Sequence, residues 1–219
     1  MAEQQKVSLS LDSNRDKKIF KELVAQNPNS LVAPATIRTE VLLKKGQQGY
    51  SFSLIEDTGS SITEKKLART DRFKVTELGM FIFVRNPSMI GHEVLHTYPN
   101  SVAFAAIENA LNPLHLEALY NGFWSYTVDQ VVFITGRDLK KFRYVSETQQ
   151  TDANNKSSLD DMAGFCEIEP QFLIDANKKN LFEISVPFSS DHLIAGDDTH
   201  KVYVAFIFRG FLISPLGKK

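Results

Sequence analysis

The sequence predicts an all-β fold of packed sheets. Residues 201–213 form an almost wholly apolar run rich in Val, Ile and Phe, and shorter runs of the same kind lie at residues 80–84 and 131–134. β-branched and aromatic side chains favour strands, and apolar side chains on both faces indicate strands that are covered on both sides. The 16 Phe residues suit the wide layer between sheets. We therefore expect a β-barrel or β-sandwich.

Composition limits the class of protein. A chain of 219 residues is long enough for one large β domain or two small ones. The net charge of −1 provides no basic field, so specific nucleic-acid binding is not expected. Cys166 is the only cysteine, which excludes an intrachain disulfide and a cysteine-based zinc site. Residues 1–6 lack the order of a secretory leader and no apolar run reaches 18 residues, so synthesis in a reducing cytosol is expected.

The first element along the chain is an expected N-terminal helix at residues 13–26. Ser13 can cap it, and Asn27-Pro28 ends it, because the residue before a proline disfavours the helical conformation. The apolar residues of this segment fall on one predicted face: Ile19, Phe20, Leu23 and Val24.

Strands are expected to follow this helix. Residues 36–43 and 50–55 are predicted to form a hairpin around the turn at residues 45–49. Residues 72–76 alternate between polar and apolar and continue past Gly79, which indicates a bulge, into the run at 80–84. A short strand is predicted at residues 93–97.

A second helix is predicted near residues 113–120. Asn112 can cap it, Pro113 suits its first position, and Asn121-Gly122 suits its end. Further strands are expected at residues 123–128, 131–135, 140–146, 165–168, 181–186 and 202–213, which brings the total to about a dozen. The helix divides these strands into two groups of similar size, which could mean two barrels. Residues 149–161 are polar and are interpreted as an exposed loop.

The search for a catalytic or cofactor-binding site nominates no residue. The sequence has no phosphate-binding glycine loop and no GxSxG nucleophile elbow. The basic segment 136–141 is interpreted as a surface turn, and Ser189-Ser190-Asp191-His192 as a solvated loop, because catalytic triads come from separated positions. Cys166 is interpreted as a small buried hydrophobe rather than a nucleophile.

The best candidate metal ligands are Asp197, Asp198 and His200. Two carboxylates and an imidazole this close could meet a divalent cation, although Asp-Asp before a strand is ordinary turn chemistry, and no metal is expected. His92 and His96 have the i, i+4 spacing of a zinc helix. Their segment is interpreted as extended, which would hold the two imidazoles too far apart for one ion. His115 is interpreted as exposed in the first turn of the second helix.

Two other groups of side chains have alternative interpretations. Trp124 and Tyr126 are spaced by two and could form a stacking platform for a sugar or a base, although packing in a sheet core is favoured. The pairs Lys44-Lys45 and Lys65-Lys66 are interpreted as solvated turns that could also touch lipid head groups.

Three short motifs carry a family resemblance, and they occur in one order along residues 36–150. They are RTDRFKVTELG at residues 69–79, HTYPN at 96–100 and LYNG at 119–122. They resemble virion structural proteins predicted for phages and proviruses of Bacteroidetes. This group of virion proteins is associated with membrane-containing icosahedral phages, whose major capsid proteins carry a double jelly-roll.

The resemblance implies a jelly-roll fold, with a double jelly-roll favoured over a single elaborated one. Residues 1–30 would then form a helical arm, residues 31–111 a first jelly-roll, and residues 112–219 the second helix and a second jelly-roll. Alternatively, residues 31–219 form a single β-sandwich domain, which the length also fits.

The function implied is that of a major capsid protein acting without catalysis in the virion. Its partners would be other copies, in trimeric capsomers and a lattice, and other virion proteins. Alternatives are a minor virion, penton or spike-base protein, and a carbohydrate-binding β-sandwich that uses Trp124 and Tyr126. The N-terminal segment could face an internal membrane or a neighbouring copy through its basic residues: Arg15, Lys17, Lys18 and Lys21.

Overall fold

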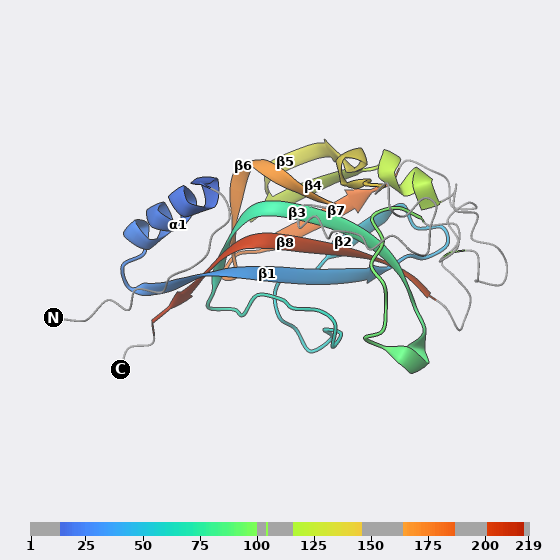
Figure 1. The fold of residues 1–219 in the computed structure, drawn as a ribbon, viewed down its shortest axis with the longest axis horizontal. Coiled ribbons are helices and arrows are strands. Elements are labelled where there is room, and N and C mark those ends of the chain that lie inside the picture. The colour runs from blue at the N-terminus through green and yellow to red at the C-terminus, as the bar shows by residue number, and fades with distance from the viewer. Residues whose placement is uncertain (1–13, 100–103, 105–115, 146–163, 187–200, 217–219) are drawn as a thin grey trace, which may run out of the picture.

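The fold was examined in a computed structural model, which describes residues 14–99, 104, 116–145, 164–186 and 201–216. Two four-stranded antiparallel sheets form the molecule (Figure 1). The long sheet has the order β1-β8-β3-β6, with β1 at Ser30–Leu42, β8 at Lys201–Pro215, β3 at Arg72–Arg85 and β6 at Phe165–Asp175. The short sheet has the order β2-β7-β4-β5, with β2 at Gly49–Phe52, β7 at Asn180–Ser185, β4 at Phe123–Val128 and β5 at Val131–Asp138.

The eight strands pair in a nested pattern. β4 pairs with β5, β3 with β6, β2 with β7, and β1 with β8, always antiparallel. The pairs β3–β8 and β4–β7 then join these four ladders into the two sheets. Each sheet therefore takes strands from both halves of the sequence. The four nested pairs, from β4–β5 at the centre to β1–β8 at the ends, correspond to one long hairpin that is rolled up.

Aromatic rings fill the layer between the sheets. Phe52 and Phe182 of the short sheet meet Phe206 and Phe208 of the long sheet, with ring centroids 4.8–5.1 Å apart. These rings meet edge to face, an arrangement that stabilises the fold by about 0.5–1.5 kcal/mol per pair beyond the effect of burying the rings. The abundance of Phe is thus explained by the core, as the sequence indicated.

Strand β8 is covered on both faces, as its apolar run predicts. Its even-numbered residues from 202 to 208 enter the layer between the sheets. On the outer face, Ala205 and Ile207 pack with Phe81, Leu95 and Phe165. The outer face of the long sheet is therefore a second apolar surface, and it too needs covering.

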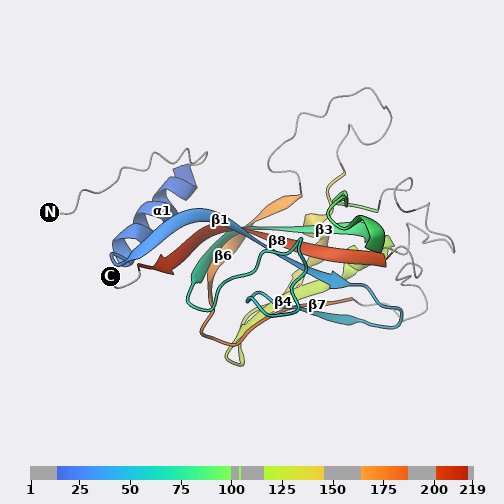
Figure 2. The ribbon, with the colours of Figure 1, turned by 90° about the horizontal axis from the view of Figure 1, so that it is seen from below.

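The helix α1, at Asn14–Gln26, covers one end of that outer face (Figure 2). Ile19 and Leu23 pack against side chains of β1 and β8, namely Val32, Phe211 and Ile213. The predicted N-terminal helix and its apolar face are confirmed, except for Val24, which is 45% exposed. Ser13, its expected cap, lies outside the described residues.

The predicted hairpin of residues 36–43 with 50–55 is wrong. β1 and β2 belong to different sheets, since the Leu43 N–H donates to Val202 O of β8 at 2.9 Å and β2 pairs with β7. The Tyr50 hydroxyl holds the crossing by donating to the carbonyl oxygens of Lys44 and Gln47. The turn at residues 45–49 therefore carries the chain from one sheet to the other.

The strand predicted at residues 140–146 is also wrong. The 3₁₀ helix η3, at Leu139–Phe142, begins where the Asp138 carboxylate accepts from the Lys140 N–H at 2.8 Å. Its two buried side chains, Leu139 and Phe142, are three residues apart, which is the period of such a helix.

The bulge in β3 lies between Val75 and Glu77 rather than at Gly79. Gly79 is needed for another reason, because a Cβ there would lie 2.8–3.0 Å from the rings of Phe81 and Phe165. At the bulge itself the backbones approach so closely that a Cβ on Gly210 would lie 1.9 Å from Lys74 O.

The remaining predictions of elements are confirmed in part. Residues 116–121 are helical and include the 3₁₀ helix η2 at Ala118–Asn121, which ends at Gly122, while residues 112–115 lie outside the described part of the chain. Residues 93–97 contribute only one bridge, from His96 to Ile82. The described residues form eight strands of the dozen expected, and the all-β class is confirmed.

Candidate functional site

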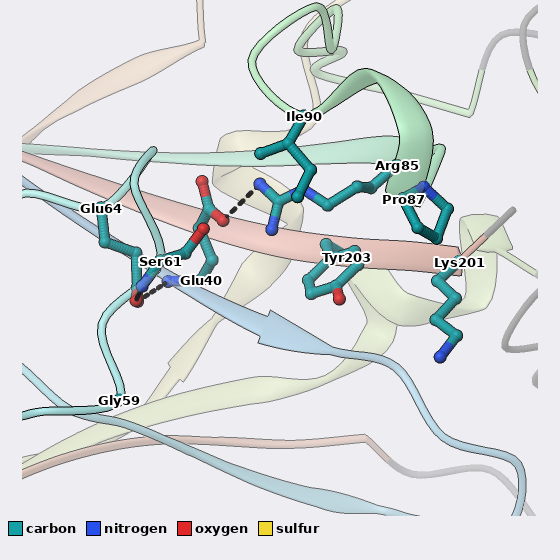
Figure 3. A pocket seen from close by; sticks show the side chains of 9 residues that line it. All are labelled: Glu40, Gly59, Ser61, Glu64, Arg85, Pro87, Ile90, Lys201 and Tyr203. Carbon is teal, nitrogen blue, oxygen red and sulfur yellow. Dashed lines mark hydrogen bonds and ion pairs between the residues drawn. The ribbon is translucent and has the colours of Figure 1, made fainter.

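The end of the outer face opposite α1 carries buried charged side chains beside aromatic rings. Glu40 of β1 and Arg85 of β3 flank Tyr203 of β8 on this face (Figure 3). Two connecting segments pass over them: residues 53–71, between β2 and β3, and residues 86–97, which follow β3 and include the 3₁₀ helix η1 at Pro87–Met89. Five charged residues, which we call the Arg85 cluster, hold these segments to the sheet: Arg38, Glu40, Glu64, Arg85 and Glu93.

Arg85 is the centre of the cluster. Its Nη2 donates to Glu40 Oε2 and to Thr63 Oγ1, both at 2.7 Å, and its Nε donates to Glu93 Oε1. The side chains of Arg85, Glu40 and Glu93 are only 8%, 2% and 4% exposed. Since Thr63 and Glu93 belong to the two covering segments, one guanidinium ties both segments to β1.

Aromatic rings hold the Arg85 guanidinium from the other side. Its Cζ lies 4.6 Å from the ring centroid of Tyr203 and 5.0 Å from that of Phe83, and these two rings stack at 5.4 Å. A guanidinium over a ring face is attracted by the negative charge of that face, the more so when water is excluded. The position of Arg85 is therefore fixed by carboxylates and rings together.

Glu64 is a second centre within the same cluster. Its carboxylate accepts from the backbone N–H of Glu40 at 2.9 Å and from that of Ser61 at 2.8 Å. Lys66, whose side chain is 6% exposed, lies 3.4 Å from it. Arg38 completes the pairing by lying 2.6 Å from Glu40 Oε1, and its backbone also exchanges two hydrogen bonds with that of Lys65. Residues 61–66 are thus fastened along the edge of β1.

Arg85 and Glu93 are held in their charged forms. Burial alone would lower the pKa of Arg85, but the carboxylates of Glu93 and Glu40 more than offset that effect, and its pKa is raised. Burial would raise the pKa of Glu93, whereas the hydrogen bond and the charge of Arg85 lower it below the usual value of 4.5. Buried charges in such mutual contact depend on one another, because removing one partner leaves the other unpaired in a buried site.

A cavity of about 460 Å³ opens beside the Arg85 cluster. Three members of the Arg85 cluster line it, together with residues of the covering segments and of β8, which Figure 3 shows around it: Glu40, Glu64 and Arg85, with Ser61, Ile90, Lys201 and Tyr203. The carboxylates that line it, Glu40 and Glu64, are already engaged by Arg85, Arg38 and Lys66. The arrangement therefore serves best to lock two surface segments in place.

The structure places Trp124 and Tyr126 in the core. Trp124 is 3% exposed and stacks at a tilt on Phe182 with centroids 5.5 Å apart. Tyr126 is 0% exposed, lies 4.4 Å from Phe172, and donates its hydroxyl proton to Asn180 Oδ1 at 2.6 Å. The core-packing interpretation is confirmed, and the platform for sugars or bases is wrong for these two rings.

Among the residues that the structure describes, Cys166, His92 and His96 are brought into no common site. The Cys166 Sγ donates to Lys141 O at 3.0 Å, and burial raises the pKa of this thiol, which favours the unreactive protonated form. His96 lies against Phe104 at 5.5 Å, where burial lowers its pKa, while His92 is exposed. Across the described part of the chain, no three His, Cys, Asp or Glu side chains gather as metal ligands.

Several predicted residues fall outside the described residues. They include the metal candidates Asp197, Asp198 and His200, the segment 189–192, and His115. The lysine pairs are described: Lys44, Lys45 and Lys65 are exposed as expected, but Lys66 is buried in the ion pairs of the Arg85 cluster. Segment 136–141 is split between the end of β5 and η3.

Sequence reasoning missed the Arg85 cluster. Glu40 lies among the mixed polar and apolar residues of β1, and Arg85 ends the apolar run of β3; solvated side chains are the ordinary interpretation at both positions. Glu64 follows Glu40 by 24 residues and Glu93 follows Arg85 by 8, and both partners come from segments whose apolar residues have no regular period. A signal was present in Glu64, which follows Ser61 at the spacing of a capping box, although it closes a turn here.

Comparison with known proteins gives no further information on the function of this chain. No protein-family model, curated protein or solved structure matches this chain. Within the described residues, the structure contains no helix long and apolar enough to cross a bilayer.

Proposed function

We propose that this protein is a structural component of a virion, built on a single eight-stranded jelly-roll. The observation that carries the proposal is the nested pairing of β1 with β8, β2 with β7, β3 with β6 and β4 with β5. Two facing four-stranded sheets with this winding are typical of jelly-rolls, which occur in viral capsid proteins and in some lectins and enzymes.

A single barrel is favoured over a double one by the partners of each strand. β1, β2 and β3 come from residues 31–111 apart from one residue of β1, and β6, β7 and β8 come from residues 112–219. These two groups pair with each other across both sheets. We therefore propose an arm at residues 1–30 followed by one jelly-roll domain at residues 31–219.

The capsid role is favoured over the other roles of this fold by two observations. The motifs at residues 69–79, 96–100 and 119–122 resemble phage virion proteins. Burial of Trp124 and Tyr126 removes the rings expected to bind a carbohydrate. Because fold alone does not specify function, the motifs are needed beside the topology.

In this role the protein acts by shape and contact. Copies associate through their sides and loops into trimeric capsomers that tile an icosahedral shell and contact other virion proteins. The Arg85 cluster stiffens the outer face of the long sheet, so that neighbouring copies meet a defined surface. No catalytic step and no cofactor belong to the proposal.

The helix α1 offers a basic surface for the inside of the shell. Lys17, Lys18 and Lys21 are exposed on it, whereas Arg15 lies 3.3–3.4 Å from the carboxylates of Glu167 and Glu169 on β6. We propose that the three lysines meet the anionic head groups of an internal membrane. Replacing all three by Gln should abolish flotation of the full chain with anionic vesicles at low salt while leaving its melting temperature unchanged.

The capsid role is tested by the native mass of the purified full chain, measured by light scattering, with negative-stain imaging of the same peak. Trimers that convert to sheets or shells as protein concentration rises are the expected result. Trimers that never form a lattice would point to a minor virion or penton protein instead. A monomer at every concentration would contradict the proposal.

A further inference from the structure

Two cations lie side by side at the charged end of the outer face. Arg85 of β3 and Lys201 of β8 are directly opposite each other in the β3–β8 ladder. Such residues point to the same face of an antiparallel sheet with Cβ atoms about 4.5–5.5 Å apart, and like charges in these positions destabilise the sheet. Figure 3 shows both side chains, with Tyr203 next to Lys201 on β8. Each of these cations therefore benefits from a nearby anion.

Within the described residues, carboxylates pair with Arg85 but not with Lys201. Arg85 has Glu40 and Glu93 as its partners. The ion pairs described on this face join the following cations and carboxylates, without Lys201: Arg38, Lys66 and Arg85 with Glu40, Asp57, Glu64 and Glu93. The Lys201 side chain is partly buried, so water only partly compensates its charge. Its ammonium is available to an anion from outside the chain.

The carboxylates on this face are already matched by the other cations. Glu40 lies 2.6 Å from Arg38 and 2.7 Å from Arg85, and Glu64 lies 3.4 Å from Lys66. Asp57 lies 3.7 Å from Lys66, but its side chain is 48% exposed, so water screens its charge. The remaining carboxylates and cations are equal in number: Glu40, Glu64 and Glu93 against Arg38, Lys66 and Arg85. Lys201 thus leaves one positive charge over.

Three hydrogen-bond donors on this face lack an acceptor among the described residues. The hydrogen bonds of Arg85 use its Nε and Nη2, which leaves its Nη1. The other two donors are the Lys201 ammonium and the Tyr203 hydroxyl, which lie two residues apart on the same face of β8. Arg85, Lys201 and Tyr203 all line the cavity of about 460 Å³. Hydrogen bonds from cationic donors such as these are strongest to an ionised acceptor, so the lining favours an anion.

The cavity also has an apolar wall. Pro87 and Ile90, from the segment that follows β3, line it, and the Ile90 side chain is 50% exposed. Small-molecule sites commonly combine apolar walls with a few polar groups in a volume of about 300–1,000 Å³, a range that includes this cavity. The lining therefore suits a small molecule that has one negative charge and an apolar part.

We propose that this cavity binds a small carboxylate with an apolar chain. The carboxylate accepts hydrogen bonds from the Lys201 ammonium, Arg85 Nη1 and the Tyr203 hydroxyl, and the chain lies against Ile90 and Pro87. A carboxylate is favoured over a phosphate ester, because Lys201 supplies one unbalanced positive charge whereas the ester carries about 1.5–2 negative charges at pH 7. The site is independent of the proposed virion role, since no contact between copies enters it.

Titration of the full chain with hexanoate tests the proposal, with hexanamide and hexylamine as neutral and cationic probes of the same shape. Amide shifts in ¹H–¹⁵N NMR spectra should saturate with a Kd of about 1 mM, an ordinary affinity for a ligand of this size. The shifted amides should include those of Ile90, Lys201 and Tyr203. Hexanamide should bind about tenfold more weakly, because it lacks the charge, and hexylamine should not bind.

Four variants assign the contacts. Lys201→Gln should weaken hexanoate binding about tenfold and leave hexanamide binding unchanged, because only hexanoate uses the charge. Tyr203→Phe keeps the ring beside Arg85 and should weaken hexanoate binding about threefold through loss of the hydroxyl. Ile90→Ser should weaken both probes alike, since both chains lie on the same wall. Lys65→Gln, at an exposed lysine outside the cavity lining, is the matched control and should bind hexanoate as the natural protein does.

Several results would overturn the proposal. They are equal binding of hexanoate and hexanamide, hexanoate binding that Lys201→Gln leaves unchanged, and tighter binding of hexylamine. Hexanoate that causes no saturable shift at the cavity would overturn it too, as would shifts confined to the exposed lysines of α1, which indicate only a general attraction of an anion to cations. The capsid proposal stands apart from all of these results, because its test is the native mass of the chain without added hexanoate.

Discussion

The two ends of the long sheet's outer face are covered by different chemistry. At one end, α1 buries apolar side chains, with Leu23 and Ile19 against Phe211 and Ile213. At the other end, the Arg85 cluster holds two irregular segments by ion pairs and hydrogen bonds. Truncating an apolar side chain lowers the stability of the fold in proportion to the buried area that is lost. Removing one partner of a buried ion pair costs more, because the other charge is left buried and unpaired. The charged end should therefore be the more sensitive to single changes and to acid.

The largest effect is expected from Arg85→Met. The substitution keeps most of the length of the side chain but leaves Glu93 without its cation and Glu40 with Arg38 alone, in sites where the two carboxylates are 4% and 2% exposed. We expect the free energy of unfolding to fall by about 3–5 kcal/mol. Urea unfolding followed by tryptophan fluorescence measures the change through the buried Trp124.

The matched control for this change is Arg143→Met. Arg143 also lies 2.8 Å from a carboxylate, that of Glu117, but both side chains are 39% exposed. Exposed pairs contribute about 0–1 kcal/mol, so this variant should unfold close to the natural protein. Equal losses in the two variants would show that burial does not set the strength of the Arg85 cluster.

A smaller loss is expected from Leu23→Ala in α1. The side chain is 7% exposed against β1 and β8, and its removal should lower the free energy of unfolding by about 2 kcal/mol, the low end for such truncations, because the site lies at the rim of the sheet. The neighbouring Val24→Ala, at 45% exposure, is the control and should change it by less than about 0.5 kcal/mol. A larger loss from Val24→Ala than from Leu23→Ala would place the helix on its other face.

Glu93→Gln should remove the acid sensitivity that Glu93 gives to the charged end. The pKa of Glu93 is lowered in the folded state, so its contribution is complete above the unfolded value of 4.5 and is lost as the pH falls below it through the folded value. At pH 7 the variant should be less stable by about 1–2 kcal/mol, since Gln still accepts a hydrogen bond from Arg85 but carries no charge. Unfolding in urea from pH 7 to pH 3 should show the two proteins converging, and a difference that grows in acid would contradict this.

Glu77→Gln should give the smallest effect, with the opposite sign. Glu77 lies on β3 near α1, where burial raises its pKa above 4.5 although Arg209 is 3.7 Å away. A raised pKa means that the charged form costs stability at neutral pH. This cost declines as the pH falls through the raised folded value and is gone below the unfolded value of 4.5. The variant should therefore match or slightly exceed the natural protein in melting temperature at pH 7 and equal it at pH 4. A clear loss at pH 7 would show that the Arg209 pair outweighs burial.

The parts of the fold that depend on local pattern could be predicted from the sequence. The apolar faces of β3 and β8, the helix α1 and the end of η2 at Gly122 all follow from period and capping, and the structure confirms them. What failed depends on partners distant in sequence. Residues 36–43 and 50–55 have the pattern of a hairpin, but the better partners for β1 and β2 are β8 and β7.

The Arg85 cluster could not be predicted for the same reason. Glu40, Glu64 and Glu93 become neighbours of Arg85, or of its partners, only after the sheets have formed. Trp124 and Tyr126 show the converse, since a period of two says that two rings share a face but not whether that face is buried. For these rings the structure decides in favour of the core.

The nested pairing supports both the fold and the function proposed, and it predicts how the two halves of the chain behave apart. We expect residues 1–111 and 112–219, expressed separately, to be unfolded by circular dichroism and by amide dispersion in NMR spectra, and to regain the β-sheet spectrum of the full chain when they are refolded together. Each half lacks the strands that complete its sheets. Cooperative unfolding of either half alone would contradict the single jelly-roll and restore the two-barrel arrangement.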